Sequence, residues 1–185
     1  AWSKGEQSEL LWEGYIPASA NEFRVKEIQE KYGVLNTCVF VDIGFEWGQT
    51  TQMCADQGWF GIRGNGQVMS YRHKLRKGGT VDKLYSPKRI AQGEGGSKCF
   101  YIELATDPVK DILARLMSGT GLKWVIPKDV SNPYKLHMKS EVRREGLKGK
   151  SKNVVGYWEQ VSRQNHLFDC EVYNVACALM VGIFD

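Results

Sequence analysis

The chain has 185 residues, of which 42% are hydrophobic, and a formal net charge of +4 at pH 7. This size and composition exclude a disordered or fibrous protein. They predict one domain, residues 1–185, whose hydrophobic core is large enough to be stable without disulfide bonds or structural metal ions. The five cysteines show no CxxC spacing, which predicts reduced thiols and no zinc site. No apolar stretch approaches about 20 residues and no leader opens the chain, so we expect neither a membrane partner nor secretion.

The N-terminal part of the sequence predicts a hairpin followed by a helix. Residues 1–2 and 10–16 are the expected strands, joined by a tight turn at residues 3–7. Residues 22–31 are expected to form a helix whose buried side consists of Phe23, Val25, Ile28 and Tyr32.

The next segment predicts a strand-helix-strand unit, around which the rest of the chain is organised. Residues 38–41 are a short, β-branched strand that ends on Asp42, residues 49–57 a helix stopped by Gly58, and residues 59–63 a second strand. In open α/β sheets, the carboxyl end of the first strand is where ligands and chemistry are found. Asp42 is therefore a candidate functional acid, although a turn or capping aspartate explains its position equally well.

Residues 64–80 have no clean period and predict a long basic loop. Strands are expected at residues 81–85 and 99–104, around a glycine-rich loop at residues 91–97. The bases of the long loop are Arg72, His73, Lys74, Arg76 and Lys77.

The last part of the sequence predicts mainly helices and one hairpin. We expect a helix at residues 107–117, a strand at 124–126, a helical turn at 134–138, a hairpin at 140–157 and a helix at 165–184. The tip of the hairpin carries Lys148, Lys150 and Lys152.

The last helix carries the second candidate acid. Asn165 can cap it, and His166 and Asp169 share a face near its first turn, where Asp169 lies in an otherwise apolar run. Taken alone, an aspartate that favours the helix dipole is the commoner explanation. Together with Asp42, however, two carboxylates on one site would supply the oxygen ligands for Mg²⁺ or Mn²⁺ that phosphodiester hydrolysis requires.

Four segments stand out in chain order: VFVDIGFEWGQTTQMCADQG, WFGIRGNG, YKLHMKSEV and NHLFDCEVYNVACALM. Together they resemble the C-terminal nuclease domain of the large terminase subunit of tailed double-stranded DNA phages, most of all its lambda-like branch. The resemblance implies an α/β, ribonuclease-H-like fold, a mixed sheet flanked by helices, and a two-metal endonuclease that cuts concatemeric DNA during packaging. It implies that Asp42 and Asp169 are catalytic ligands of two Mg²⁺ or Mn²⁺ ions.

Two positions depart from the family pattern. The family's first catalytic aspartate lies on the opening, central strand, whereas no aspartate precedes Asp42 here. We therefore expect a fragment of a longer polypeptide, with the first central strand missing and the ATPase domain absent. Arg63 stands where the family usually has lysine, and its charge predicts contact with phosphate.

The remaining expectations concern supporting residues and DNA. Glu46 is a candidate metal ligand through water. His166 is a candidate to orient Asp169 or contact substrate, although a capping or core-edge histidine is the commoner explanation. Glu141 is expected to form a salt bridge with a nearby basic residue rather than to bind metal. Bases that would hold backbone phosphate, unless they are merely solvated, are Arg63, Arg143, Arg144, Lys148, Lys150 and Lys152.

The resemblance also implies partners and a place of action. The partners would be double-stranded DNA, the portal protein and the small terminase subunit, and the place the host cytoplasm, on assembling procapsids. Two alternatives stay open: a nonenzymatic DNA- or portal-docking module of a packaging motor that keeps the fold without a complete metal site, and another member of the superfold such as a resolvase or transposase.

Overall fold

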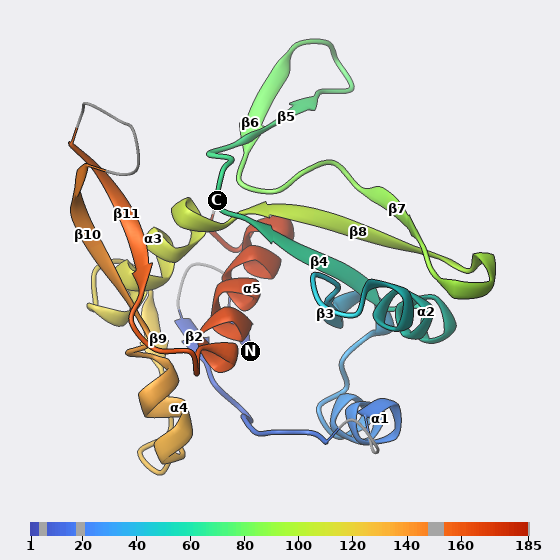
Figure 1. The fold of residues 1–185 in the computed structure, drawn as a ribbon, viewed down its shortest axis with the longest axis horizontal. Helices are drawn as coiled ribbons and strands as arrows, with labels where there is room; N and C mark the ends of the chain where they lie inside the picture. The colour runs from blue at the N-terminus through green and yellow to red at the C-terminus, as the bar shows by residue number, and fades with distance from the viewer. Residues whose placement is uncertain (4–6, 18–20, 148–153, 185) are drawn as a thin grey trace. The chain divides into compact units, whose positions relative to one another are not determined.

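The computed structural model describes residues 1–3, 7–17, 21–147 and 154–184 (Figure 1). They fall into two compact units, each described separately below. The central unit is Gly14–Thr106, and the terminal unit combines Ala1–Glu13 with Asp107–Asp185. The fold is mixed α/β, with sheets flanked by helices, as the sequence predicts.

The central unit is built on a four-stranded mixed sheet. Its strands are β3 (Phe40–Asp42), β4 (Phe60–Asn65), β8 (Lys98–Ala105) and β7 (Arg89–Gln92), in this spatial order. β3, β4 and β8 are parallel, and β7 runs antiparallel to β8 at the edge. The strand-helix-strand unit predicted around Asp42 is therefore confirmed.

Helix α2 (Trp47–Gln57) packs on this sheet and closes the core of the central unit. It ends at Gly58, whose φ of 67° is the left-handed conformation expected of a helix stop. The buried cluster beneath it consists of Ile43, Cys54, Trp59, Ala91 and Cys99. Gly61 in β4 lets the elements approach closely, since a Cβ there would lie 2.8 Å from Ile43 Cδ1 and 2.9 Å from Tyr101 Cβ.

Helix α1 (Asn21–Lys31) precedes a 3₁₀ turn, η2 (Asn36–Cys38), which occupies the start of the strand expected at residue 38. The predicted burial of Phe23 is wrong, because its side chain is 74% exposed. Val25 is the α1 residue that packs against the buried cluster. Hydrogen bonds also hold the helix: the Trp59 indole donates to Gln29 Oε1 at 3.1 Å, and Gln29 Nε2 donates to the Val34 carbonyl at 2.9 Å.

The long loop predicted at residues 64–80 is wrong in its second half. Tyr71–Lys74 forms β5 and pairs antiparallel with β6 (Thr80–Lys83), so the segment is a hairpin. Its strand period is hidden in the sequence because the alternate residues Tyr71 and His73 are polar and find polar partners. The loop expected at residues 91–97 likewise overlaps β7 and is otherwise a short 3₁₀ turn, η3 (Glu94–Gly96).

The terminal unit begins with a small sheet of β1 (Trp2–Ser3), β2 (Gln7–Glu9) and β9 (Lys123–Val125). β1 and β2 are antiparallel, and β2 and β9 are parallel. The strand predicted at residues 10–16 is wrong, since the returning strand is β2 and the chain beyond it is irregular. The partner of β2, strand β9, ends at Val125, so the backbone hydrogen bonds of a strand have no partner strand beyond that residue.

The remaining elements of the terminal unit confirm the predicted order. They are α3 (Thr106–Met117), α4 (Asn132–His137), the antiparallel pair β10 (Glu141–Leu147) and β11 (Val154–Gln160), and α5 (His166–Met180). Helix α5 ends four residues before the predicted limit. The hairpin-tip lysines Lys148, Lys150 and Lys152 lie outside the described residues. None of the described helices is both long and apolar enough to cross a membrane.

Replacing Gly61 with alanine is expected to destabilise the central unit by about 1–3 kcal/mol, because the added methyl group would overpack Ile43 and Tyr101. Urea unfolding measures the change. Gly146→Ala is the matched strand control, since its Cβ would meet its nearest neighbour, Tyr157, at an ordinary 3.8 Å. Equal stability of the two variants would contradict the close approach.

The cysteines provide a second test of the core. Burial raises the pKa of the Cys54 thiol to about 12, while Cys38 is exposed. Because the thiolate is the reactive form, the raised pKa alone should slow iodoacetamide alkylation of Cys54 at pH 8 roughly a thousandfold relative to a thiol of ordinary pKa. The exposed Cys38 serves as the comparison within the same protein. At pH 9 the Cys54 thiol should still be protonated, so its alkylation should stay slow. Mass spectrometry of the alkylation time course measures both rates. Comparable alkylation rates of Cys54 and Cys38 in the folded protein would refute the burial of Cys54.

Candidate functional site

Asp42 lies at the carboxyl end of β3, as the sequence predicts. Its carboxylate is exposed, and Oδ1 accepts the Gly44 N–H at 2.7 Å. This bond fixes the turn that leads from the strand toward α2. The turn role that the sequence offers as one alternative is therefore confirmed, and the functional role of Asp42 stays a prediction.

Glu46 lies at the start of α2 in an unusual backbone conformation. Its φ of 49° is the only positive φ of a non-glycine residue in the described part of the chain. Its side chain is exposed and makes no capping hydrogen bond, while its carbonyl accepts the Thr50 N–H at 3.0 Å. Left-handed non-glycine residues cost free energy and cluster at functional sites, which draws attention to the turn between Asp42 and α2.

Arg63 is exposed on β4, one residue beyond the partner of Asp42. The register pairs Asp42 with Ile62 and Arg63 with Glu103. Because successive side chains alternate between the faces of a sheet, Arg63 belongs to the face opposite that of Asp42. Its neighbour Glu103 forms an ion pair with Arg89 at 3.1 Å. The predicted phosphate contact of Arg63 stays a prediction, and it would be made from the other face.

Asp169 lies in the first turn of α5 in the terminal unit and is half-buried. The Asn165 amide nitrogen donates to Asp169 Oδ2 at 3.0 Å and to Glu141 Oε1 at 3.4 Å. Asn165 occupies the predicted capping position, but its side chain makes no capping bond. It links two carboxylates instead.

Glu141 forms the salt bridge that the sequence predicts, and its partner is Lys110 on α3. Lys110 Nζ lies 2.5 Å from Glu141 Oε2, and the two residues are only 9% and 8% exposed. Burying both charges is tolerated because each offsets the other. The contacts therefore form a chain from Lys110 through Glu141 and Asn165 to Asp169. The role of Lys110 was missed from the sequence, although its place beside Val109, on the side of α3 that faces the core, was a signal.

Two histidines lie at the start of α5. His166 is exposed, and its ring centroid lies 6.3 Å from that of His137. His137 Nδ1 accepts the Leu167 N–H at 3.1 Å and so satisfies one of the free donors of the helix. His137 thus supplies the side-chain contact that we expected from Asn165, and the sequence offered no local signal for it.

The predicted DNA-binding arginines of β10 have acidic partners. Arg143 Nε lies 2.8 Å from Asp111 Oδ1, and Arg144 Nε lies 2.9 Å from Glu159 Oε2. Trp158 Nε1 also donates to Asp111 at 2.9 Å. Phosphate contact by these arginines stays a prediction, and it would compete with the existing ion pairs.

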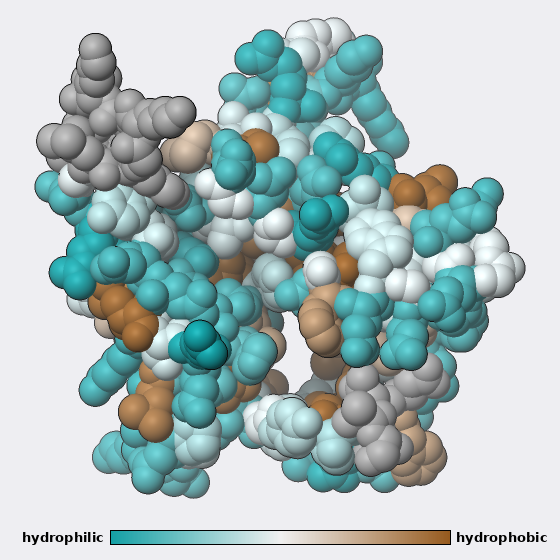
Figure 2. Space-filling view, viewed as in Figure 1, coloured by the Kyte–Doolittle hydropathy of each residue, from teal (hydrophilic) through white to brown (hydrophobic). Residues whose placement is uncertain are grey.

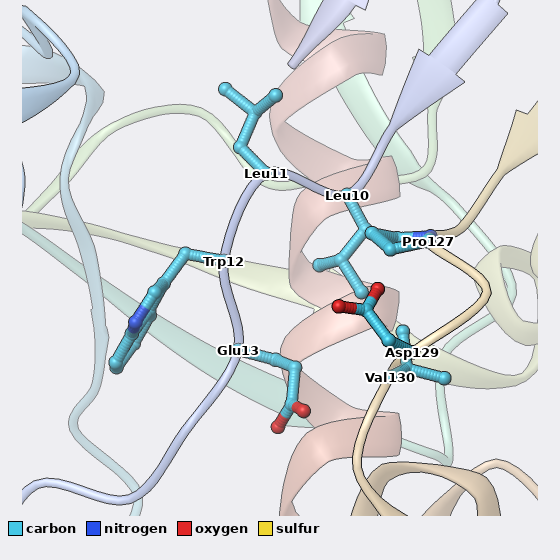
Figure 3. Close-up of a pocket in the computed structure, with 7 residues that line it drawn as sticks. All are labelled: Leu10, Leu11, Trp12, Glu13, Pro127, Asp129 and Val130. Carbon is cyan, nitrogen blue, oxygen red and sulfur yellow. The ribbon is translucent and has the colours of Figure 1, made fainter.

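A pocket in the terminal unit adds no chemistry to these residues (Figure 3). Glu13 Oε1 is engaged by the Ser131 N–H at 3.0 Å, and Trp12 points away from Pro127 and Asp129. The other lining residues are Leu10, Leu11 and Val130. The pocket lining therefore contains no base and no nucleophile beyond two carboxylates.

The donor chemistry of Asp42 and Asp169 suits Mg²⁺ or Mn²⁺, which prefer oxygen ligands. Among the residues that the structure describes, no group of three or more His, Cys, Asp or Glu side chains is arranged to hold a metal ion. The two acids belong to different units, and the structure places each within its own unit only.

Comparison with known protein families identifies the family of this chain. The family model described as terminase large subunit gpA, endonuclease domain, matches residues 27–184. The chain belongs to this family. No curated protein and no solved structure matches the chain.

Membership in the terminase endonuclease family confirms the resemblance drawn from the four sequence segments. The matched range contains Asp42, Glu141 and Asp169 and omits β1, β2 and the start of α1. The family is a nuclease family, which supports a nuclease role, DNA as a partner and a connection with phage DNA packaging in general terms.

Replacing Lys110 with methionine is expected to destabilise the terminal unit by about 3–5 kcal/mol, because Glu141 would keep a buried charge without its partner. The double variant Lys110→Met/Glu141→Leu should recover most of the loss. Arg144→Met is the control, since its exposed ion pair with Glu159 contributes at most about 1 kcal/mol. Urea unfolding of the four proteins compares them. A double variant as unstable as Lys110→Met would refute the unpaired-charge explanation.

Proposed function

We propose that the chain is a metal-dependent DNA endonuclease that cuts concatemeric phage DNA during genome packaging, with Asp42 and Asp169 as ligands of two Mg²⁺ or Mn²⁺ ions. The observation that carries the proposal is the terminase endonuclease match, which spans both acids. The position of Asp42 at the carboxyl end of a parallel strand supports it, because active sites of open α/β sheets lie there.

The surroundings of each acid suit a fixed carboxylate. Asp42 is held by its bond to the Gly44 N–H, and Asp169 is oriented by Asn165. The buried Lys110–Glu141 pair holds Asn165 in turn, so Lys110 and Glu141 are positioning residues in this proposal. Glu46 and His166 are proposed to support the metal ligands, through water or by contact with substrate.

When bound, the ions would neutralise charge on the phosphate and favour attack by water, which is the chemistry of two-metal nucleases. In hydrolysis, the attacking water loses a proton to solvent as its oxygen forms a bond to phosphorus. The bond to the leaving sugar oxygen breaks, and that oxygen takes up a proton from solvent. The carboxylates contribute by holding the ligand geometry during this displacement.

The finer structural and cellular assignments belong to the same proposal. The proposed fold is ribonuclease-H-like. The mixed sheet, with β7 antiparallel at the edge of three parallel strands, agrees with an α/β nuclease domain. We further propose the portal protein and the small terminase subunit as partners, and the host cytoplasm, on assembling procapsids, as the place of action.

Nicking of supercoiled plasmid with Mn²⁺ or Mg²⁺ tests the proposal. Asp42→Asn and Asp169→Asn should each lower the rate at least about a hundredfold, because each removes a charged metal ligand. Calorimetry should show weaker Mn²⁺ binding by both variants. Asp56→Asn is the control, since Asp56 is an exposed acid of the central unit that accepts a hydrogen bond from Gln52.

A longer polypeptide that contains this chain should be assayed beside it, because no aspartate precedes Asp42 in the sequence. Activity only in the longer protein, lost on substitution of Asp42 or Asp169, would support the proposal and place a further ligand outside these residues. A folded, DNA-binding protein that is inert in both forms would refute it and leave a docking module of the packaging motor as the better account.

A further inference from the structure

The β5–β6 hairpin of the central unit, Tyr71–Lys74 and Thr80–Lys83 with the connecting turn, concentrates positive charge on a small element. It contains one acid, Asp82. Its cationic residues are Arg72, Lys74, Arg76, Lys77 and Lys83. Figure 2 shows hydrophilic residues over this hairpin, which Figure 1 labels β5 and β6.

One face of the hairpin is anchored to the rest of the central unit. His73 Nε2 lies 2.6 Å from the Tyr85 carbonyl oxygen, and Lys83 Nζ lies 3.0 Å from the Tyr85 hydroxyl. The Tyr71 hydroxyl reaches Glu103 Oε2 at 3.5 Å. Alternation along the strands places Tyr71, His73 and Lys83 on the same face. This face therefore holds the hairpin in place.

The other face and the turn carry basic side chains that are unpaired or only weakly paired. Arg72 is opposite Asp82, and their ion pair at 3.4 Å is exposed, so it contributes little. Lys74, Arg76 and Lys77 are exposed, and none of them forms an ion pair with another residue in the described part of the chain. The anchored hairpin thus carries three unpaired cations at and beside its tip.

The hairpin contributes little to the core. Val81 and Leu75 are 37% and 51% exposed, and every residue from Lys74 to Lys83 is exposed. Exposed basic residues could simply belong to a solvated charged loop. A solvated loop, however, would not need two paired strands with one face fixed by three polar contacts. A polyanion with regularly spaced phosphates complements several unpaired cations on one element.

We propose that the β5–β6 hairpin binds the sugar-phosphate backbone of double-stranded DNA through Lys74, Arg76 and Lys77, without reading sequence. The choice of DNA as the occupant rests on the proposed nuclease function. The hairpin adds a contact surface that is separate in the chain from Asp42 and Asp169.

The test measures binding of a short fluorescent duplex by anisotropy in EDTA, so that no cleavage occurs, from about 50 to 200 mM NaCl. Arg76→Ala/Lys77→Ala should weaken binding roughly tenfold and reduce the slope of log K against log salt by about 1.8, or 0.9 for each lost phosphate contact. Arg76→Lys/Lys77→Arg should bind like the original chain, because backbone contact depends on charge. Lys26→Ala/Lys31→Ala removes the same net charge from the exposed surface of α1 and should leave the slope unchanged.

Circular dichroism confirms that each variant is folded. Unchanged affinity and slope in Arg76→Ala/Lys77→Ala would overturn the inference, as would an equal loss in the α1 control. The inference would also be overturned if Arg76→Ala/Lys77→Ala lost binding to single-stranded RNA but still bound the DNA duplex. Because the assay excludes metal, a chain that binds DNA through the hairpin but never cleaves plasmid would refute the nuclease proposal alone.

Discussion

The buried ion pair between Lys110 and Glu141 is the interaction on which the terminal unit's candidate site depends. Both charges are almost fully removed from water, so neither is tolerated without the other. Glu141 has a second oxygen, which accepts from Asn165, and the same amide reaches Asp169. Helices α3 and α5 and strand β10 are thereby joined through polar contacts, and the orientation of Asp169 follows from a pair formed far away in the sequence.

Asp42 is held by a different principle. Its carboxylate accepts the N–H of Gly44, two residues on, so this contact is local. The core beneath supplies the rigidity: Gly61 allows Ile43 and Tyr101 to pack closely against β4, and α2 covers the sheet. The same acid type is thus fixed by backbone geometry in one unit and by a side-chain network in the other.

This difference explains how much could be predicted from the sequence. Apolar periodicity and stop signals gave α2, α3, α5 and the β10–β11 hairpin, and the strand that ends on Asp42. The strand at residues 10–16 was wrong because a strand needs a partner, and β9 is too short to supply one. The strand expected at residues 81–85 covers most of β6, but β5 was missed because its alternation is between two kinds of polar residue. Lys110, His137 and the linking role of Asn165 depend on contacts between distant segments, which spacing does not reveal.

The ion pairs also determine how much each basic residue would gain from contact with a DNA phosphate. Arg143 would have to leave Asp111, whose carboxylate also accepts the Trp158 indole N–H, and Arg144 would have to leave Glu159. Such exposed pairs are weak, so a phosphate can replace the acid, but the exchange gains only the difference between two similar interactions. Lys74, Arg76 and Lys77 would gain the full electrostatic free energy of a phosphate contact, because they break no ion pair within the described residues. Electrostatic contact with a DNA backbone should therefore be stronger for Lys74, Arg76 and Lys77 than for the arginines of β10.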